Sequence, residues 1–491
     1  MSVKRLIRPD SALLIAAIFL LSRAVYFLAG VRFNFSPLDD HWQFLDPVLL
    51  HDQLAESIFY LHIQPPLLNL ICALAGKVSA DRGQCLLNVL FLLLGLSNAL
   101  CMRTLMVRLG ASVKVALAVT VLFILNPVSV LYENYLFYTH IVMTLLCVSS
   151  LLLERYFATR RTPWIACFFV SAACVVLIRS SFHIAWLALV AAVVTTFAPP
   201  GDRKKVLAAA AIPLALALGW YLKTRCLFGT FGSSTWMGMS LVNSWRSTCT
   251  QDELDALYQA RVISKLTRDV QPMSQLKDYA PYVRLPPPTG HEVLDQPCRS
   301  GGRANFNHIG YVGVSNQYLA DSRNLLKARP RIILRNQQYS WPRYFRPSSQ
   351  YHLLGQSNLS KVRWWDRFYR IVYYWQIEDQ PDDSAAAPGI LAFAVQQLRD
   401  MSLSTLIGTA VIVFYVPWRA RRLWKEGRKP VALTLLFSWF NIIYVACICN
   451  LLEMGENHRF RFETEGLWTI LMAVILTDVI AAVRRRRQRV H

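Results

Sequence analysis

Residues 38–68 read LDDHWQFLDPVLLHDQLAESIFYLHIQPPLL and follow directly after the first long apolar run of the chain. The stretch holds two adjacent carboxylates, Asp39 and Asp40, and ends in a His-x-x-Pro-Pro that begins at His62. Neither half is apolar enough to cross a bilayer, yet both are threaded with aromatic and aliphatic side chains. We therefore expect the stretch to lie on a membrane surface, with the rest of the chain as its scaffold.

The composition predicts a polytopic membrane protein. The chain has 491 residues, of which 54% are hydrophobic and only 17% are charged. Such a chain buries apolar residues in lipid as well as in a core. The net charge of +22 comes mostly from short basic clusters between apolar runs. That pattern is typical of membrane topology and argues against a nucleic-acid partner.

The apolar runs predict an all-α fold with about ten transmembrane helices. Runs of spanning length cover residues 12–29, 84–107, 112–132, 135–154, 163–180, 182–198, 205–223, 389–416, 431–451 and 466–483. If these helices alternate in direction, every basic cluster in a short loop falls on one side except Arg459 and Arg461. Positive charge stays on the cytoplasmic side, so both termini are expected in the cytoplasm.

We expect three units along the chain. Residues 1–224 form an N-terminal transmembrane module with a catalytic outer loop at 31–83, residues 225–388 an exported and mostly helical domain, and residues 389–491 the C-terminal transmembrane helices. Two cysteine pairs, Cys249 with Cys298 and Cys72 with Cys85, are candidates for disulfides in an oxidising compartment.

The acidic pair is the first candidate for chemistry. Asp39 and Asp40 follow Pro37 at the outer end of the first helix, where a carboxylate can act as a base or hold a divalent ion. The simpler interpretation is a solvated turn, because Asp after Pro is common in loops. Pro65 and Pro66 end the surface helix and fix where the chain re-enters the bilayer.

This order of features resembles the GT-C glycosyltransferases that use polyprenyl-phosphate sugars. The acidic pair after the first helix, the surface helix and the His-x-x-Pro-Pro-Leu at 62–67 are similar to bacterial lipopolysaccharide sugar transferases, lipid A aminoarabinose transferases and protein O-mannosyltransferases. The resemblance implies that Asp39 is the catalytic base. The family usually has Asp-Glu where this chain has Asp-Asp, so the choice between Asp39 and Asp40 stays open.

Two later segments extend the resemblance. Glu133 follows Asn126-Pro127 as an acidic residue of the second outer loop, and GENHRFRFETEG at 455–466 is similar to the Arg-bearing segment before the final helices. The likeness covers the first half and the end of the chain and leaves out residues 225–388.

The resemblance implies a reaction at the outer membrane face. A hexose or pentose moves with inversion from a polyprenyl-phosphate donor to a glycan, lipid or protein acceptor. The acceptor hydroxyl needs a base, and the departing phosphate needs a cation. Arg459 and Arg461 are candidates for the cation; the other interpretation pairs them with glutamates in a structural network. A divalent cation, Mg or Mn, held by Asp39 and Asp40 stays an open possibility.

Further candidates for substrate contacts lie near the predicted boundaries of the membrane. Arg179 and His183 stand in LIRSSFH between two apolar runs, where either a functional role or snorkelling to the interface explains a charged residue. Glu133 and His62 are also candidates for substrate contact. For His62, the alternative is a purely structural role beside the proline pair. The mixed basic and aromatic residues of 321–349 favour a segment over anionic headgroups, with donor or acceptor contact as the alternative.

Two other functions compete with this one. An O-antigen ligase or polymerase also combines many helices with a long outer loop, but uses a pyrophosphate-linked donor. A transporter of lipid or solute is disfavoured because the chain shows no internal repeat. The Arg-rich composition favours a bacterial inner membrane, whereas the acceptor sequences NFS at 34–36 and NLS at 358–360 leave the endoplasmic reticulum open.

Overall fold

The computed structural model describes residues 9–78, 80–376 and 397–490. Within these ranges the chain is a set of α-helices joined by turns, and no strand longer than an isolated bridge occurs. The two bridges join Asn34 to Tyr135 and Cys298 to Ala304. This confirms the predicted all-α class.

Seven helices in the described ranges are long and apolar enough to cross a membrane. They are α1 (Pro9–Leu28), α6 (Ala80–Arg108), α9 (Tyr138–Thr159), α12 (Arg203–Phe228), α24 (Leu403–Lys425), α25 (Lys429–Leu452) and α27 (Glu465–Val490). Helices α7 (Val113–Leu125) and α8 (Pro127–Glu133) count as an eighth span if the bent pair is one segment. The protein is therefore a multi-pass membrane protein.

Two of the ten predicted spans correspond to shorter helices. The runs at 163–180 and 182–198 form α10 (Thr162–Ile178) and α11 (Ile184–Phe197), which have 17 and 14 residues. At 1.5 Å of rise per residue, a span of the roughly 30 Å hydrocarbon core needs about 20. The run predicted at 389–416 also differs, because α24 begins at Leu403, where the Ser402 side chain caps it, while residues 389–396 lie outside the described ranges.

The bend between α7 and α8 follows from two residues. The Asn126 side chain accepts a hydrogen bond from Val128 N at 3.0 Å and so caps α8, and Pro127 has no N–H to continue α7. The two helices meet at 59°. The single run predicted at 112–132 is thus a broken helix that ends in Glu133.

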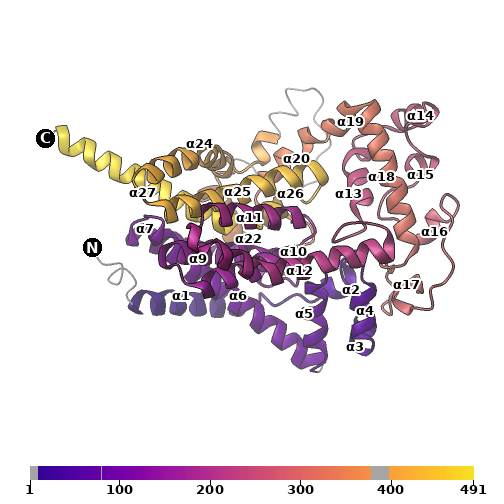
Figure 1. The fold of residues 1–491 in the computed structure, drawn as a ribbon, viewed down its shortest axis with the longest axis horizontal. Helices are drawn as coiled ribbons and strands as arrows, with labels where there is room; N and C mark the ends of the chain where they lie inside the picture. The colour runs from indigo at the N-terminus through magenta and orange to yellow at the C-terminus, as the bar shows by residue number, and fades with distance from the viewer. Residues whose placement is uncertain (1–8, 79, 377–396, 491) are drawn as a thin grey trace.

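Short helices gather at one end of the bundle. Figure 1 shows the beginning of α1 and the end of α27 at the opposite end, which also carries the basic run Arg484–Arg487. Following the sequence-based expectation of cytoplasmic termini, we call the end with the short helices the outer end. Its helices before α6 are α2 (Pro37–Asp40), α3 (Pro47–Asp52), α4 (Leu54–Tyr60) and α5 (Leu67–Gly76).

The insertion after α12 supplies the other short helices. They are α13 (Met237–Arg246), α14 (Gln251–Gln259), α15 (Lys265–Asp269), α16 (Leu276–Tyr279), α17 (Glu292–Asp295), α18 (Gly310–Ala328), α19 (Pro330–Arg335), α20 (Gln337–Tyr344), α21 (Gln356–Lys361) and α22 (Arg363–Val372). A last one, α26 (Asn457–Phe462), lies between α25 and α27.

The insertion has a hydrophobic core of its own, and the first outer loop is part of it. Leu45, Leu50 and Ile63 of the loop pack with residues of α13 and α18, among them Trp245 and Tyr318. Residues after α20, such as those of α21 and α22, join the transmembrane core instead. The predicted exported domain is therefore divided between two cores. All eleven cysteines are free thiols, so neither candidate disulfide forms.

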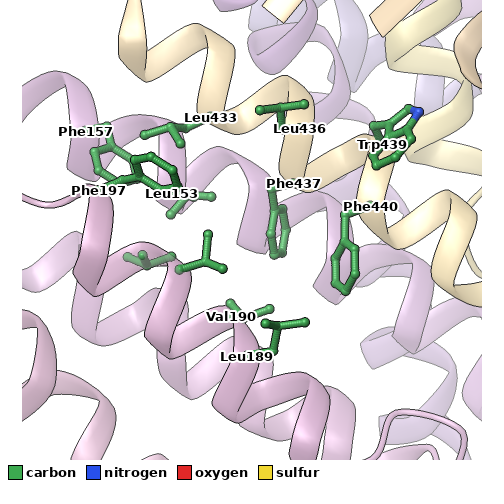
Figure 2. A pocket seen from close by; sticks show the side chains of 12 residues that line it. Leu153, Phe157, Leu189, Val190, Phe197, Leu433, Leu436, Phe437, Trp439 and Phe440 are labelled. Atoms are coloured by element: carbon green, nitrogen blue, oxygen red, sulfur yellow. The ribbon is translucent and has the colours of Figure 1, made fainter. Parts of the chain in front are cut away.

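A lateral cavity of about 230 Å³ lies among α9, α11 and α25. Figure 2 shows its lining, which consists only of apolar side chains such as Phe157, Phe197 and Phe437. Because no titratable group lines it, this cavity has no means for acid–base chemistry.

Candidate functional site

A polar cleft of about 520 Å³ opens at the outer end of the bundle. The first outer loop forms one wall, and the turn after α20 forms the other. Its lining residues are Asn34, Ser36, Asp40, His41, Trp42, Gln43, Arg303, Tyr351, His352, Leu353, Gly355, Gln356, Ser357 and Glu456. Four segments far apart in the sequence thus meet here: residues 34–43, Arg303, residues 351–357 and Glu456.

The acidic pair forms a single helical turn beside this cleft. Pro37 begins α2, and the backbone N–H of His41 closes the turn on the Pro37 carbonyl at 2.9 Å. Asp39 and Asp40 are both exposed, but only Asp40 lines the cleft. The Asp40 carboxylate lies 3.0 Å from an Arg303 guanidinium nitrogen. Of the two aspartates, Asp40 is the one that a molecule in the cleft meets.

A hairpin of the insertion forms hydrogen bonds with the acidic turn and the residues after it. The Arg299 guanidinium is buried and donates to the carbonyls of Leu38 at 3.2 Å, Phe44 at 3.3 Å and also Asp39. The Ser300 hydroxyl and N–H both donate to the Asp46 carboxylate at 2.6 Å. This hairpin, residues 298–304, turns through Gly302 at a φ of +78°.

His41 connects the acidic turn to the end of α8. Its Nε2 lies 2.5 Å from the Tyr135 hydroxyl, and its ring packs edge-on against Phe137. Burial lowers the pKa of His41 to about 4, with Glu456 opposing the shift and Arg459 adding to it. The imidazole is therefore neutral at pH 7 and serves as a hydrogen-bond partner of the Tyr135 hydroxyl, since so low a pKa makes it a weak base.

The far wall of the cleft carries an ion pair between a buried arginine, Arg459, and a partly exposed glutamate, Glu456. Glu456 accepts a hydrogen bond from the Tyr351 hydroxyl at 3.0 Å and contacts the Arg459 guanidinium. Burial raises the pKa of Glu456, but Arg459 and Tyr351 together lower it below its usual value. Arg459 is 1% exposed and lies over the rings of Phe137 and Tyr351. Glu456 faces the cleft as a carboxylate with Arg459 behind it.

The other sequence-predicted cations lie outside the cleft lining. Arg461 is buried against Glu465 and donates to the Ser348 hydroxyl at 2.9 Å. Arg179 lies 2.9 Å from Glu463 and donates to the Tyr138 hydroxyl at 2.7 Å. Arg461, like Arg459, has a glutamate partner, as the structural interpretation of the sequence required. The Glu463 partner of Arg179 was not predicted, because the structural alternative for Arg179 was snorkelling to the interface.

The two predicted histidines have structural partners. His62 is fully buried, with Nδ1 2.8 Å from the Thr235 hydroxyl and Nε2 2.8 Å from the Asn307 carbonyl. His183 accepts from Ala185 N at 3.2 Å and caps α11. Neither of these residues lines the cleft, and their predicted contact with substrate stays a prediction.

Glu133 is 1% exposed and lies 2.6 Å from the Arg23 guanidinium of α1. The close approach of Gly95 to the Glu133 carboxylate leaves no room there for a larger residue. Glu133 thus fixes the end of α8 to α1 and α6, outside the cleft lining.

Within the described residues, no group of three or more histidines, cysteines, aspartates or glutamates is arranged to hold a metal ion. Asp39 and Asp40 are the two carboxylates for which the sequence suggested one. Of these two, only Asp40 lines the cleft, and the other carboxylate in the lining is Glu456.

The comparisons with known proteins add no constraint. Neither a family model, nor a curated protein, nor a solved structure matches this chain. The site is therefore interpreted from its own residues.

Sequence reasoning missed four residues of this site: His41, Arg299, Arg303 and Tyr351. His41 directly follows the acidic pair, so the triplet Asp-Asp-His at 39–41 was a usable signal. The three others lie in the insertion, and nothing in their local sequence indicates which loop they meet.

Proposed function

We propose that this protein is a membrane glycosyltransferase that moves a sugar from a polyprenyl-phosphate donor to an acceptor hydroxyl at the outer membrane face. The observation that carries the proposal is the pairing of Asp40 with Arg303 at 3.0 Å in a polar cleft at the outer end of the helices. A base and an exposed cation side by side at headgroup depth are what this transfer needs.

In the proposed reaction, the Asp40 carboxylate takes the proton of the acceptor hydroxyl. The acceptor oxygen forms its bond to the anomeric carbon on the face opposite the phosphate, and the bond between that carbon and the phosphate oxygen breaks. The bonding electrons leave with the polyprenyl phosphate, whose charge Arg303 stabilises. The anomeric configuration is inverted because a single displacement occurs.

Asp40 is favoured over Asp39 as the base because Asp40 is in the cleft lining, whereas the backbone of Asp39 is engaged by Arg299. Arg303 is favoured over Arg459 and Arg461 as the phosphate partner because Arg303 is 65% exposed. A phosphate would otherwise have to replace a buried glutamate, at a large cost in free energy.

The test is release of polyprenyl phosphate by the purified protein from a panel of lipid-phosphate sugars, with a cell-envelope extract as acceptor and with or without Mg or Mn. Asp40→Asn is expected to lower turnover by about 100-fold or more, the usual contribution of a general base. Asp39→Asn is expected to retain most activity. Asp252→Asn, on the exposed surface of α14, is the matched control.

If the wild-type protein consumes none of these donors, the proposal fails. If Asp39→Asn is inactive and Asp40→Asn is active, with both folded, the assignment of the base is reversed.

A further inference from the structure

Helix α22 has an apolar face that the protein leaves uncovered. Its sequence is RWWDRFYRIV at 363–372, and Trp375 follows one turn later. Within the described residues, the exposed apolar side chains of this face are Trp364 at 74%, Phe368 at 47%, Ile371 at 55%, Val372 at 55% and Trp375 at 53%. The positions of Trp364, Phe368, Ile371 and Val372 place these four side chains on one side of α22, and Trp375 follows after the helix ends.

The opposite face of α22 is bonded to the broken transmembrane helix. Trp365 Nε1 donates to the Leu125 carbonyl at 3.1 Å, and the Tyr369 hydroxyl donates to the Leu122 carbonyl at 3.0 Å. Both carbonyls belong to the last turn of α7, where Pro127 offers no N–H and the helix ends. Backbone carbonyls without donors are costly in a membrane, and α22 supplies donors to these two, with the Tyr26 hydroxyl of α1 as a second donor to Leu125 at 2.9 Å.

The segment before α22 is bonded to the outer end of α1. Asn358 of α21 donates to the Arg32 carbonyl at 2.7 Å and accepts from the Arg32 N–H at 3.0 Å. Helices α21 and α22 therefore lie across the outer ends of two membrane helices, α1 and α7.

The charges beside the apolar face complete the pattern. Arg363 and Arg367 are exposed next to Trp364 and Phe368, one helical turn apart. Tryptophan beside arginine on one helix face is the arrangement of segments that lie among lipid headgroups, with the rings among the upper acyl chains and the guanidinium groups at the phosphates.

We propose that α22 is an interfacial helix whose apolar face inserts into the outer leaflet of the bilayer and whose arginines bind anionic headgroups. The partner is the lipid surface. This inference concerns lipid contact alone and does not depend on the proposed sugar transfer. It also changes the nature of the 225–388 unit, because part of it becomes membrane-embedded.

The test places the photo-reactive residue p-benzoylphenylalanine at position 364 of the full-length protein, reconstituted in nanodiscs of phosphatidylglycerol and phosphatidylcholine. The same residue at position 252, on exposed α14, is the control. After irradiation, mass spectrometry is expected to find on the order of tenfold more lipid adduct at position 364 than at position 252. Position 368 is a second site in case the replacement of Trp364 prevents folding.

Three outcomes would overturn the inference. A cross-link from position 364 to a peptide of the same chain means that the protein covers this face itself. A cross-linked dimer means that a second copy of the chain covers this face. If the yield of lipid adduct at positions 364 and 368 only equals that at position 252, the face is exposed to water.

A charge variant tests the headgroup contact separately. With the probe at position 368, phosphatidylglycerol adducts are expected to exceed phosphatidylcholine adducts at equal lipid content, and Arg363→Gln with Arg367→Gln is expected to bring their ratio to about one. A ratio unchanged by the two substitutions would contradict binding of anionic headgroups by these arginines.

Discussion

His41 Nε2 lies 2.5 Å from the Tyr135 hydroxyl and so ties the acidic turn of the first outer loop to the segment that follows α8. The bridge between Asn34 and Tyr135 joins the same two segments through their backbones. Because α8 exists only where α7 bends, the geometry of the cleft depends on a break in a membrane helix.

Arg299 should stabilise the folded conformation of the acidic turn. Arg299→Ala removes a buried guanidinium that donates to carbonyls of residues 38–44. Hydrogen–deuterium exchange of the amides of residues 38–46 is expected to become faster, since each bond to a charged donor contributes about 1.5–3 kcal/mol.

Arg303→Ala is the control for this measurement, because Arg303 contacts only the exposed Asp40 side chain in the same loop. Equal exchange in the Arg299 variant and in wild type would show that other contacts hold the turn.

Glu456 and the buried Arg459 should behave as a coupled unit. Glu456→Gln leaves the Arg459 charge buried without its carboxylate and is expected to lower the free energy of unfolding by about 3–5 kcal/mol. The double variant Glu456→Gln with Arg459→Met is expected to lose less than the sum of the two single losses. Thermal unfolding in detergent measures all three, and strict additivity would contradict the coupling.

His62 should make the protein less stable in acid. Burial lowers its pKa in the folded state to about 3 from the ordinary 6.5, so below pH 6.5 the unfolded state binds a proton that the folded state does not. Stability is fully present above pH 6.5 and is lost as the pH falls toward 3. The melting temperature of wild type is expected to fall between pH 7 and pH 4.5.

His62→Gln is expected to melt lower at pH 7, because the glutamine cannot match both bonds of the imidazole, but to lose less on acidification. The wild-type protein itself is the reference at each pH. An equal loss in the two proteins would assign the acid sensitivity to other groups, such as His41.

Gly238 should not accept a side chain. A Cβ there would collide with the Ser315 backbone carbonyl of α18, because α13 and α18 cross at close range. Gly238→Ala is expected to cost about 1–3 kcal/mol through overpacking. Gly219→Ala is the matched control, since a Cβ at Gly219 meets no atom within 4 Å, and it is expected to leave the melting temperature unchanged or raised.

The helices could be predicted from the sequence because apolar runs and proline positions determine them locally. The runs at 84–107, 431–451 and 466–483 match α6, α25 and α27 within a few residues at most ends. The runs at 163–180 and 182–198 also match α10 and α11 within two residues at each end. The apolar character of these runs does not show whether helices of 17 and 14 residues span a membrane.

The candidate site was only partly predictable. Asp39 and Asp40 stand out because they follow Pro37 at a helix end, and the glutamate partners of Arg459 and Arg461 lie three or four residues away, within the reach of one helix turn. Arg299 and Arg303 contact the acidic turn only through tertiary structure, so no local sequence pattern predicts these contacts. The sugar donor, the acceptor and the catalytic role of Asp40 remain predictions.

The Arg299 hairpin also has a consequence for biosynthesis. Its bond to Asp39 joins residues 260 positions apart, so the acidic turn leaves the ribosome long before the hairpin that holds it. Helices α5 to α12 are made in the interval, during which the first outer loop has no contact with the hairpin. The protein therefore completes its candidate site late in synthesis, and a nascent chain halted before residue 298 carries its acidic pair in a loop that has yet to fold.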